Sequence, residues 1–333
     1  MTQVVVADVF LRDGLQALRH EPGWRAPTTE EKVAMIGALD SAGVPEIEIT
    51  GFAHPRVIPS LADAEEVAVA ALARPHRAVL RALVPNLRGA ERALNAGLRK
   101  LVGLVVLSET YERLNANRSV SDGLRELARI AERVRGEPVT LAVGVATAFH
   151  CPYEGLQSES ALLALVDRVA DCGITEVVLA DSVGLAGPQL VVERCRAVSA
   201  RHPTVSLGLH LHNLGGLALA CALAAAEVGV RHFDGSVGGI GSGITMPLGA
   251  ARLGNVATED LVALFESAGI ETGIEREAIS DLGGVAQRLV GAPGASYAAS
   301  YGSLERVLAL GRAALPGLRA NPPGASQLQE VST

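Results

Sequence analysis

The chain alternates short apolar runs, rich in β-branched residues, with longer amphipathic stretches. This alternation is typical of a parallel sheet whose strands are connected by helices on its outside. The pattern predicts eight strands, near residues 3–10, 46–50, 77–85, 100–107, 139–148, 176–181, 205–212 and 231–237. Eight strands that alternate with helices indicate an α/β fold of the TIM (β/α)8 barrel class.

Amphipathic periods predict the helices between these strands. One begins at Thr29-Glu30-Glu31-Lys32, and others span residues 59–73, 119–135, 158–172, 188–200, 217–228 and 258–268. After residue 280 the alternation stops, and helix-like pieces at 281–290 and 304–315 flank a stretch rich in small residues and proline. We therefore expect a catalytic barrel over residues 1–280, and a C-terminal helical extension with a mobile tail over 281–333.

Composition narrows the classes of protein and partner. Of the 333 residues, 49% are hydrophobic but only 3% are aromatic, which predicts a large aliphatic core. The net charge of -7, without a Lys/Arg-rich run, argues against a nucleic-acid partner. The chain contains no uninterrupted apolar stretch of about 18 residues, the length that a membrane-spanning helix needs. Four scattered cysteines favour reduced thiols, and the first residues lack a signal-peptide pattern, so we expect a cytoplasmic protein.

Two histidines one residue apart, in the run His210-Leu211-His212-Asn213, close the seventh predicted strand. Side chains at i and i+2 of a strand point to the same face, so both imidazoles can bind one ion. The pair alone is a weak signal, because two ordinary histidines at a polar strand end give the same pattern. Whether the pair indicates a metal site therefore depends on which residues lie at the other strand ends.

Further polar residues lie where TIM barrels carry their reactive groups, at the carboxyl ends of the strands. Arg12 and Asp13 follow the first predicted strand, Glu48 lies within the second, Asp181 ends the sixth, and Asn255 follows the eighth. Carboxylate, imidazole and amide ligands around one centre suit a divalent ion such as Mg²⁺, Mn²⁺ or Zn²⁺. Together these residues favour a metal-dependent active site.

Several of these residues lie in longer motifs. The run Phe10-Leu11-Arg12-Asp13-Gly14-Leu15-Gln16 resembles the opening signature of the 3-hydroxy-3-methylglutaryl-CoA (HMG-CoA) lyase family, in the DRE-TIM metallolyase superfamily. The resemblance keeps its order over about residues 3–275, at 47–52, 84–89, 151–155, 181–184, 210–213, 234–237 and 254–261. It implies a divalent-metal-dependent carbon-carbon lyase that cleaves a 3-hydroxyacyl-CoA or a hydroxy-carboxylate by retro-aldol or retro-Claisen chemistry.

Carried over to this chain, the resemblance implies that Asp13, His210, His212 and Asn255 bind the metal ion, with Mg²⁺ or Mn²⁺ favoured over Zn²⁺. Arg12 would stabilise the enolate oxygen, because its guanidinium stays charged and offers several donors. The alternative is a structural ion pair with a barrel carboxylate, which is less favoured because Asp13 is its neighbour. The catalytic residues expected on this basis are Arg12, Asp13, Glu48, Asp181 and His210.

Other residues are expected to act around the ion. Glu48 would orient Arg12 or a water molecule on the metal, or else pair within the barrel floor. Asp181 would position a metal-binding histidine or the substrate, or else cap the following loop. Gln16 and Ser182 are expected among the substrate-binding residues.

The chain departs from the family in the loop after the eighth strand. Gly243 stands where the family carries the cysteine that protonates the enolate, and the arginine and tyrosine of strand five are replaced in the run Ala142-Val143-Gly144-Val145-Ala146. His54 and His150 lie near the expected rim and could replace the acid or contact the substrate, or else be ordinary loop histidines. These changes predict a lyase altered for another substrate, with HMG-CoA as the first to test.

Four functions stay open at this point. The favoured one is the metal-dependent lyase, and the second is an aldolase or a condensing enzyme that joins an acyl-CoA to a keto acid. The third is a non-catalytic metal-binding barrel, suggested by the missing cysteine, and the fourth is a decarboxylase or carboxyltransferase, for which no strand lysine is suitably placed. We expect a small-molecule substrate, with a CoA thioester as one candidate. The family and the apolar segment 304–315 suggest a homodimer.

Overall fold

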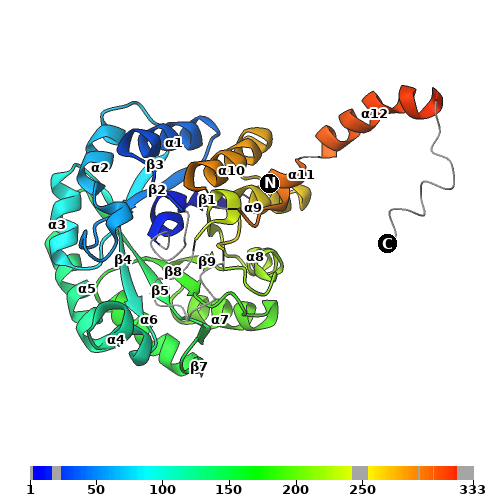
Figure 1. Cartoon of the computed structure of the whole chain (residues 1–333). Helices are drawn as coiled ribbons and strands as arrows, with labels where there is room; N and C mark the ends of the chain where they lie inside the picture. Colours follow the sequence, from blue (N-terminus) through cyan, green and yellow to red (C-terminus); the bar gives the residue numbers. More distant parts are fainter. Residues whose placement is uncertain (1–2, 17–23, 242–253, 292, 303, 321–333) are drawn as a thin grey trace.

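The computed structural model describes residues 3–16, 24–241, 254–291, 293–302 and 304–320 of the chain. Within them, eight parallel strands close into a barrel in the order β1-β10-β9-β8-β5-β4-β3-β2 (Figure 1). This confirms the predicted TIM (β/α)8 barrel. The strands are β1 (Val5–Asp8), β2 (Glu46–Gly51), β3 (Val79–Leu83), β4 (Lys100–Val106), β5 (Thr140–Ala146), β8 (Glu176–Asp181), β9 (Ser206–Leu211) and β10 (His232–Gly235).

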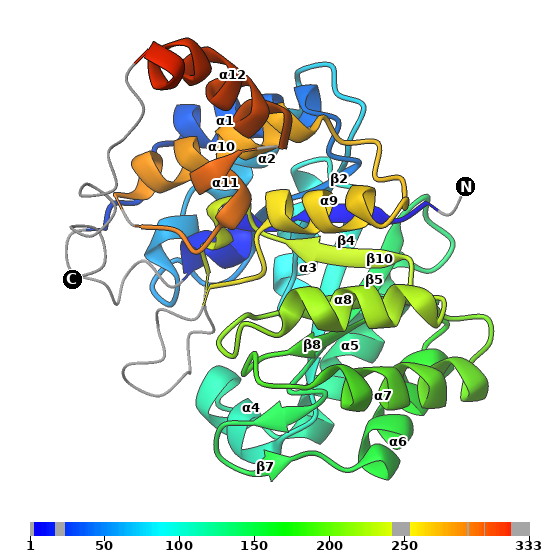
Figure 2. The same cartoon turned by 90° about the vertical axis from the view of Figure 1, so that its right-hand side faces the viewer.

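Helices cover the outside of the barrel, and Figure 2 shows α7, α8 and α9 lying side by side along it. Two short strands, β6 (His150–Cys151) and β7 (Gly155–Leu156), form a hairpin after β5. The helices are α1 (Thr29–Ser41), α2 (Ala64–Leu72), α3 (Leu87–Asn95), α4 (Glu109–Ala116), α5 (Val120–Val134), α6 (Glu159–Asp171), α7 (Pro188–Arg201), α8 (Ala218–Glu227), α9 (Thr258–Ser267), α10 (Arg276–Val290), α11 (Tyr297–Tyr301) and α12 (Leu304–Ala320).

Three of these helices, α3, α4 and α11, were missed by the sequence analysis. Helices α3 and α4 are only 9 and 8 residues long, so their apolar period repeats barely twice, and α11 has only 5 residues. Polar caps mark their starts: Asn86 Oδ1 accepts the N–H of Gly89 at 2.9 Å, and Ser108 Oγ accepts that of Tyr111 at 3.0 Å. The helix expected over 59–73 is in fact a short 3₁₀ turn, η3 (Pro59–Leu61), followed by α2.

The core between the strands and the helices is aliphatic, as the composition predicted. All five phenylalanines are buried, and among them Phe233 and Phe265 pack with their ring centres 4.9 Å apart. Cys151, Cys172 and Cys195 carry free thiols, as does Cys221. Among the described residues, no helix is both long and apolar enough to cross a membrane.

Helix α10 runs across residue 280, where the sequence analysis put the end of the barrel domain. It packs against α9 and against the short turn η4 (Val237–Gly239) that follows β10. Helix α12 extends away from the barrel in Figure 1. The division at residue 280 stays a prediction, and the end of the expected tail, residues 321–333, lies outside the described part of the chain.

Candidate active site

The first site residues lie on a single wide helical turn, η1 (Phe10–Gly14), that follows β1 directly. The carbonyl of Val9 accepts the N–H groups of Asp13 at 2.7 Å and of Gly14 at 3.4 Å, the bonding of a π-turn, a form that is frequent at functional sites. A Cβ atom on Gly14 would lie 2.8 Å from the Phe10 ring, so only glycine fits this position. The turn places Arg12 and Asp13 over the carboxyl end of the barrel.

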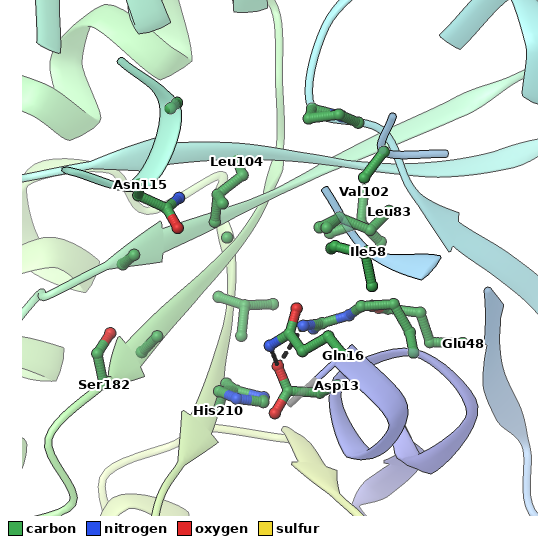
Figure 3. Close-up of a pocket in the computed structure, with 18 of the residues that line it drawn as sticks. Asp13, Gln16, Glu48, Ile58, Leu83, Val102, Leu104, Asn115, Ser182 and His210 are labelled. Atoms are coloured by element: carbon green, nitrogen blue, oxygen red, sulfur yellow. Dashed lines mark hydrogen bonds and ion pairs between the residues drawn. The ribbon is translucent and has the colours of Figure 1, made fainter. Parts of the chain in front are cut away.

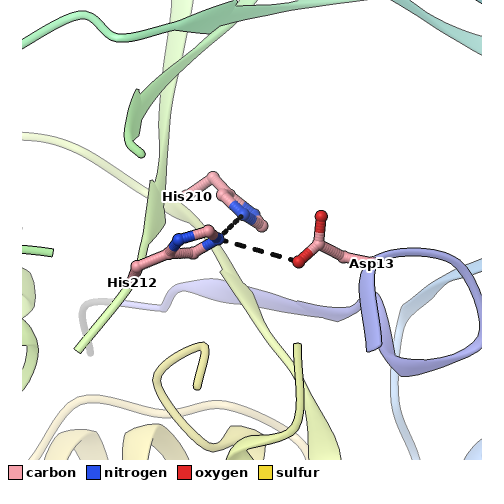
Figure 4. Close-up of side chains that lie close together, drawn as sticks. All are labelled: Asp13, His210 and His212. Carbon is pink, nitrogen blue, oxygen red and sulfur yellow. Dashed lines mark hydrogen bonds and ion pairs between the residues drawn. The ribbon is translucent and has the colours of Figure 1, made fainter. Parts of the chain in front are cut away.

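Asp13 meets the two histidines of β9 there (Figure 4). One ligand atom from each of Asp13, His210 and His212 lies within 4.8 Å of the others, and all three side chains are buried. The two histidine Nε2 atoms are 3.3 Å apart, and His212 Nε2 lies 3.7 Å from Asp13 Oδ2. The i, i+2 spacing therefore brings both imidazoles to one point, as the sequence predicted.

Both histidines have an acceptor beside their other ring nitrogen. His210 Nδ1 lies 3.3 Å from Asp234 Oδ2, and His212 Nδ1 lies 3.1 Å from the carbonyl oxygen of Ser182. Acceptors at Nδ1 favour the tautomer that carries its proton there, which leaves both Nε2 lone pairs facing each other and the Asp13 carboxylate. A cation between these atoms satisfies all of them, and this second set of contacts is the usual support of metal-binding histidines.

Asn255 completes the group. Its Nδ2 donates to Asp13 Oδ2 at 2.8 Å, while its Oδ1 is buried without a hydrogen-bond partner among the described residues. A buried amide oxygen without a partner is costly and is the ligand type that Mg²⁺ and Mn²⁺ accept. The four predicted ligands thus converge, and their donor set fits a divalent cation.

Arg12 lies between two carboxylates, those of Glu48 and Asp13, and pairs with both. Burial by itself raises the pKa of Asp13, but Arg12 and His212 outweigh it and hold that pKa well below its usual range. Asp13 is therefore ionised, as a metal ligand must be. Gln16 Nε2 donates to the other oxygen of Asp13 at 2.5 Å, so the carboxylate is held from several sides (Figure 3).

Arg81, a fully buried residue of β3 that the sequence analysis overlooked, lies beneath this site. Its guanidinium donates to Glu46 at 2.6 Å, to Glu48 at 2.8 Å and to Asp234 at 2.7 Å. Burial opposes ionisation of Asp234, yet Arg81 keeps the pKa of Asp234 well below its usual range. The available signal was a lone arginine in the apolar run of residues 79–83, which requires a buried partner.

A cavity of about 310 Å³ opens above these groups and falls in the range of small-molecule sites. Figure 3 shows Asp13, Gln16 and His210 on one side and Leu83, Val102 and Leu104 across from them. Its lining includes Arg12, Asp13, Gln16, Glu48, His54, Arg81, Leu83, Val102, Leu104, Ala142, Gly144, Val178, Ser182, His210, His212 and Asp234. The cavity therefore has a charged half and an apolar half.

The remaining predicted residues divide into two groups. Gln16, Ser182 and His54 line the cavity, whereas His150 and Asp181 are not among its lining residues. Asp181 Oδ2 accepts the N–H of Ala186 at 2.9 Å, the geometry of a loop cap, and burial raises the pKa of its carboxyl. The catalytic and binding roles of these residues stay predictions. Gly243 lies in 242–253, outside the described residues.

The barrel and the converging carboxylate, imidazole and amide groups define a class of TIM-barrel enzyme with a metal-binding centre at the carboxyl ends of its strands. Residues 3–285 match the HMGL-like family model. The chain belongs to the HMGL-like family, and it is a carbon-carbon lyase.

Relatives agree with this assignment over most of their length. The (R)-citramalyl-CoA lyase of Chloroflexus aurantiacus is 38% identical, over 84% of this chain and 88% of that protein. The hydroxymethylglutaryl-CoA lyase of Bacillus subtilis is 37% identical, over 83% of this chain and 89% of its own. A solved structure of an HMG-CoA lyase from Acinetobacter baumannii, in complex with coenzyme A and 3-methylmalate, superposes with a TM-score of 0.83 at 35% identity, covering 91% and 96% of the two chains.

The other functions considered for the sequence are not favoured by these relatives, which are named as lyases. The carboxyl transferase domain of Rhizobium etli pyruvate carboxylase matches with a TM-score of 0.66 but only 16% identity. At that identity the likeness is one of fold alone. The lyase assignment is therefore favoured over a condensing enzyme, a carboxyltransferase and a non-catalytic barrel.

Proposed function

We propose that this protein is a divalent-metal-dependent lyase that cleaves the C2–C3 bond of a 3-hydroxyacyl-CoA. The products are acetyl-CoA and a ketone or keto acid. The observation that carries the proposal is the convergence of Asp13, His210 and His212 beside the guanidinium of Arg12, at the rim of a substrate-sized cavity. The names of the two curated relatives, a citramalyl-CoA lyase and a hydroxymethylglutaryl-CoA lyase, support a CoA thioester as substrate.

Asp13, His210, His212 and Asn255 would hold the ion, with Mg²⁺ or Mn²⁺ preferred over Zn²⁺ because two of the four ligands offer oxygen. When bound, such an ion acidifies a substrate hydroxyl group and polarises a neighbouring carbonyl. The Ser182 carbonyl orients His212 through its Nδ1 atom, and the Asp234 carboxylate lies beside Nδ1 of His210. Gln16 and Arg12 hold Asp13 with its second oxygen turned toward the histidines.

Arg12 would carry the charge that develops when the bond breaks. As the C2–C3 electrons move toward the thioester, an enolate oxygen forms, and a fixed guanidinium is a strong donor for such an anion. Glu48 binds Arg12 through one oxygen and Arg81 through the other, at 2.8 Å. Glu48 therefore holds the Arg12 side chain in place rather than contacting the reacting atoms.

The enolate carbon must finally receive a proton, and we assign this step to His54. His54 lines the cavity, and its Nδ1 accepts the N–H of Arg56 at 3.1 Å, so the ring proton lies on Nε2. Histidine is the side chain most often used for proton transfer in enzymes, and His54 lies at the cavity in which the enolate would form. The His54→Asn variant should lower kcat by about 10² while leaving KM within threefold. A change in KM alone would remove His54 from this role.

Assembly and compartment are part of the proposal. The free thiols support a reducing compartment, the cytoplasm. The exposed apolar side chains of α12, Val307, Leu308 and Leu310, support a homodimer that covers them. Sedimentation velocity of the full chain beside one that ends at residue 302 tests the dimer. A full chain that sediments as a monomer contradicts it.

The function is tested by measuring acetyl-CoA release from HMG-CoA, (R)-citramalyl-CoA and 3-hydroxy-3-methylbutyryl-CoA with Mg²⁺, Mn²⁺ or chelator present. We expect release from at least one ester, and loss of release with chelator and in the Asp13→Asn and His210→Ala variants. Absence of acetyl-CoA from every ester, while the protein binds metal, contradicts the proposal.

A further inference from the structure

The apolar half of the cavity lies across the barrel from the metal-binding residues. In the closed strand order, β5 is opposite β1 and β3 is opposite β9, so the strands β3, β4 and β5 face the turn η1 and the two histidines, while β8 lies directly beside β9. Apart from Arg81 of β3, the cavity-lining side chains of β3, β4, β5 and β8 are hydrocarbon or absent: Leu83, Val102, Leu104, Ala142, Gly144, Ala146, Val178 and Ala180. Several are direct neighbours in register, with Leu104 beside Gly144 and Gly144 beside Val178.

No cation in this wall is free to bind a substrate carboxylate, as far as the described residues go. Each guanidinium that lines the cavity has a carboxylate partner: Arg12 pairs with Asp13 and Glu48, Arg81 pairs with Glu46, Glu48 and Asp234, and Arg118 pairs with Glu112. Glu112 is fully buried, so removing Arg118 from it would leave an unpaired buried carboxylate. The polar groups Asn86, Asn115 and Arg118 lie on segments beyond the strand ends.

Small residues make this wall wide as well as apolar. Ala142 and Gly144 occupy successive inward positions of β5, and a Cβ added to Gly144 would meet nothing closer than Leu104 Cδ1 at 3.5 Å. A larger side chain would therefore fit the backbone but occupy the cavity. A carboxylate set against this surface would lose its hydration without gaining a partner, whereas an alkyl chain would be favoured there.

We infer that the enzyme selects 3-hydroxyacyl-CoA substrates whose C3 substituent is a hydrocarbon chain, not a carboxymethyl group as in HMG-CoA. The inference rests on the proposed function and adds the substrate class. The cavity of about 310 Å³ lies in the size range of small-molecule sites. In this arrangement the hydroxyl and carbonyl oxygens of the substrate lie in the charged half of the cavity. Its hydrocarbon chain lies in the apolar half, against Leu104, Gly144 and Val178.

The reaction balances with no further reactant. The C3 hydroxyl gives up its proton, its oxygen becomes the carbonyl oxygen of a ketone, and the C2–C3 bond breaks. Its electron pair forms the thioester enolate, whose C2 takes up one proton to give acetyl-CoA. With 3-hydroxy-3-methylheptanoyl-CoA, the other product is hexan-2-one.

The test compares three CoA esters on the metal-loaded full chain. The acyl groups of 3-hydroxy-3-methylheptanoyl-CoA and of HMG-CoA both have ten non-hydrogen atoms, so they differ in polarity and not in size, while 3-hydroxy-3-methylbutyryl-CoA is shorter by three methylenes. Each buried methylene is worth about fourfold. We expect kcat/KM for the heptanoyl ester to exceed that for both other esters by at least about tenfold.

Each outcome decides a different point. Equal or faster cleavage of HMG-CoA overturns this inference and leaves the proposed function standing. If no ester is cleaved, the proposed function fails, and calorimetric binding of the three esters to the Mg²⁺-loaded protein decides the inference by itself. Binding that is tightest for the heptanoyl ester supports it, and binding that is equal or tighter for HMG-CoA overturns it.

A Gly144→Leu variant tests where the hydrocarbon chain of the substrate binds. Filling the wall should lower the ratio of heptanoyl to butyryl kcat/KM by about tenfold or more. The matched control is Gly37→Leu, on the exposed side of α1, where an added Cβ meets nothing within 4 Å. This ratio should be unchanged in the control. An unchanged ratio in a folded Gly144→Leu protein would show that the hydrocarbon chain of the substrate binds elsewhere. If the leucine prevents folding, the same ratio is measured in the Gly144→Ala variant.

Discussion

Asp234 joins the buried Arg81 to His210, a candidate metal ligand. One carboxylate oxygen accepts from the Arg81 guanidinium at 2.7 Å, and the other lies 3.3 Å from His210 Nδ1. Through Glu48, the same Arg81 also connects to Arg12. One buried arginine thus supports both His210, at the proposed cation site, and Arg12, the proposed donor to the enolate oxygen.

Removing a ligand should abolish both metal binding and turnover. In Asp13→Asn or His210→Ala, one of three converging donors is lost, and we expect Mn²⁺ affinity to fall by more than about 100-fold, measured by calorimetry. The control is His76→Ala, at an exposed histidine outside the cavity. Mn²⁺ affinity that survives in both ligand variants would place the metal elsewhere.

Asp234→Asn should weaken the metal site without removing a ligand. The neutral amide keeps the shape of the side chain but no longer favours the Nδ1–H tautomer of His210, so Mn²⁺ affinity should fall by about 10- to 100-fold. Asp167→Asn is a matched control, because Asp167 pairs with Arg201 and His202 on the outer face. Equal Mn²⁺ affinity in the two variants would show that Asp234 pairs with Arg81 but does not support His210.

Arg81→Met should be among the most destabilising single changes in the barrel. It leaves the carboxylates of Glu46, Glu48 and Asp234 facing one another without their shared cation, and we expect a loss of about 3–5 kcal/mol in the free energy of unfolding. Urea denaturation measures it. The exposed pair of Arg129 and Glu126 gives the comparison, since Arg129→Met should cost about 0.5 kcal/mol or less. Similar losses in the two variants would contradict a buried, interdependent cluster.

Arg12→Lys tests the enolate role. Lysine keeps the positive charge but not the planar fork that holds Glu48 and Asp13 together, so we expect kcat to fall by about 10² to 10³. Mn²⁺ affinity should change by less than about tenfold, because Arg12 is not a ligand. A variant that loses metal and activity in parallel would make Arg12 a structural partner of Asp13.

Stability should fall with rising pH because of Glu259. Burial raises the pKa of this carboxyl from 4.5 to about 8, although it accepts the N–H of Gly238 at 3.0 Å. The folded state therefore holds a proton that the unfolded state releases near pH 4.5, and this contribution is complete below that pH and lost as pH rises to about 8. Glu259→Gln should flatten the decline of the thermal midpoint between pH 5 and pH 8. An identical decline in both proteins would exclude Glu259 as its source.

The barrel and the convergence of Asp13, His210 and His212 could be predicted from the sequence alone. Alternating apolar runs follow local chain geometry, and the spacing of His210 and His212 places both on one face of any strand. A parallel barrel brings all strand ends together, so Asp13 and Asn255 could be assigned to the same ion. The short helices α3 and α4 escaped because eight or nine residues show too little periodicity.

Only the tertiary structure decided which side chains line the cavity. The three carboxylates of Arg81 come from β2 and β10, up to 153 residues away in the chain, and no local pattern pairs them. The alanines and glycine of β5 are ordinary in sequence, yet barrel closure sets them across from Asp13 and makes them part of the wall of the cavity. Local periodicity determines where strands and their ends lie, but strand order and register determine which distant residues meet, because packing acts between surfaces that are not neighbours in the chain.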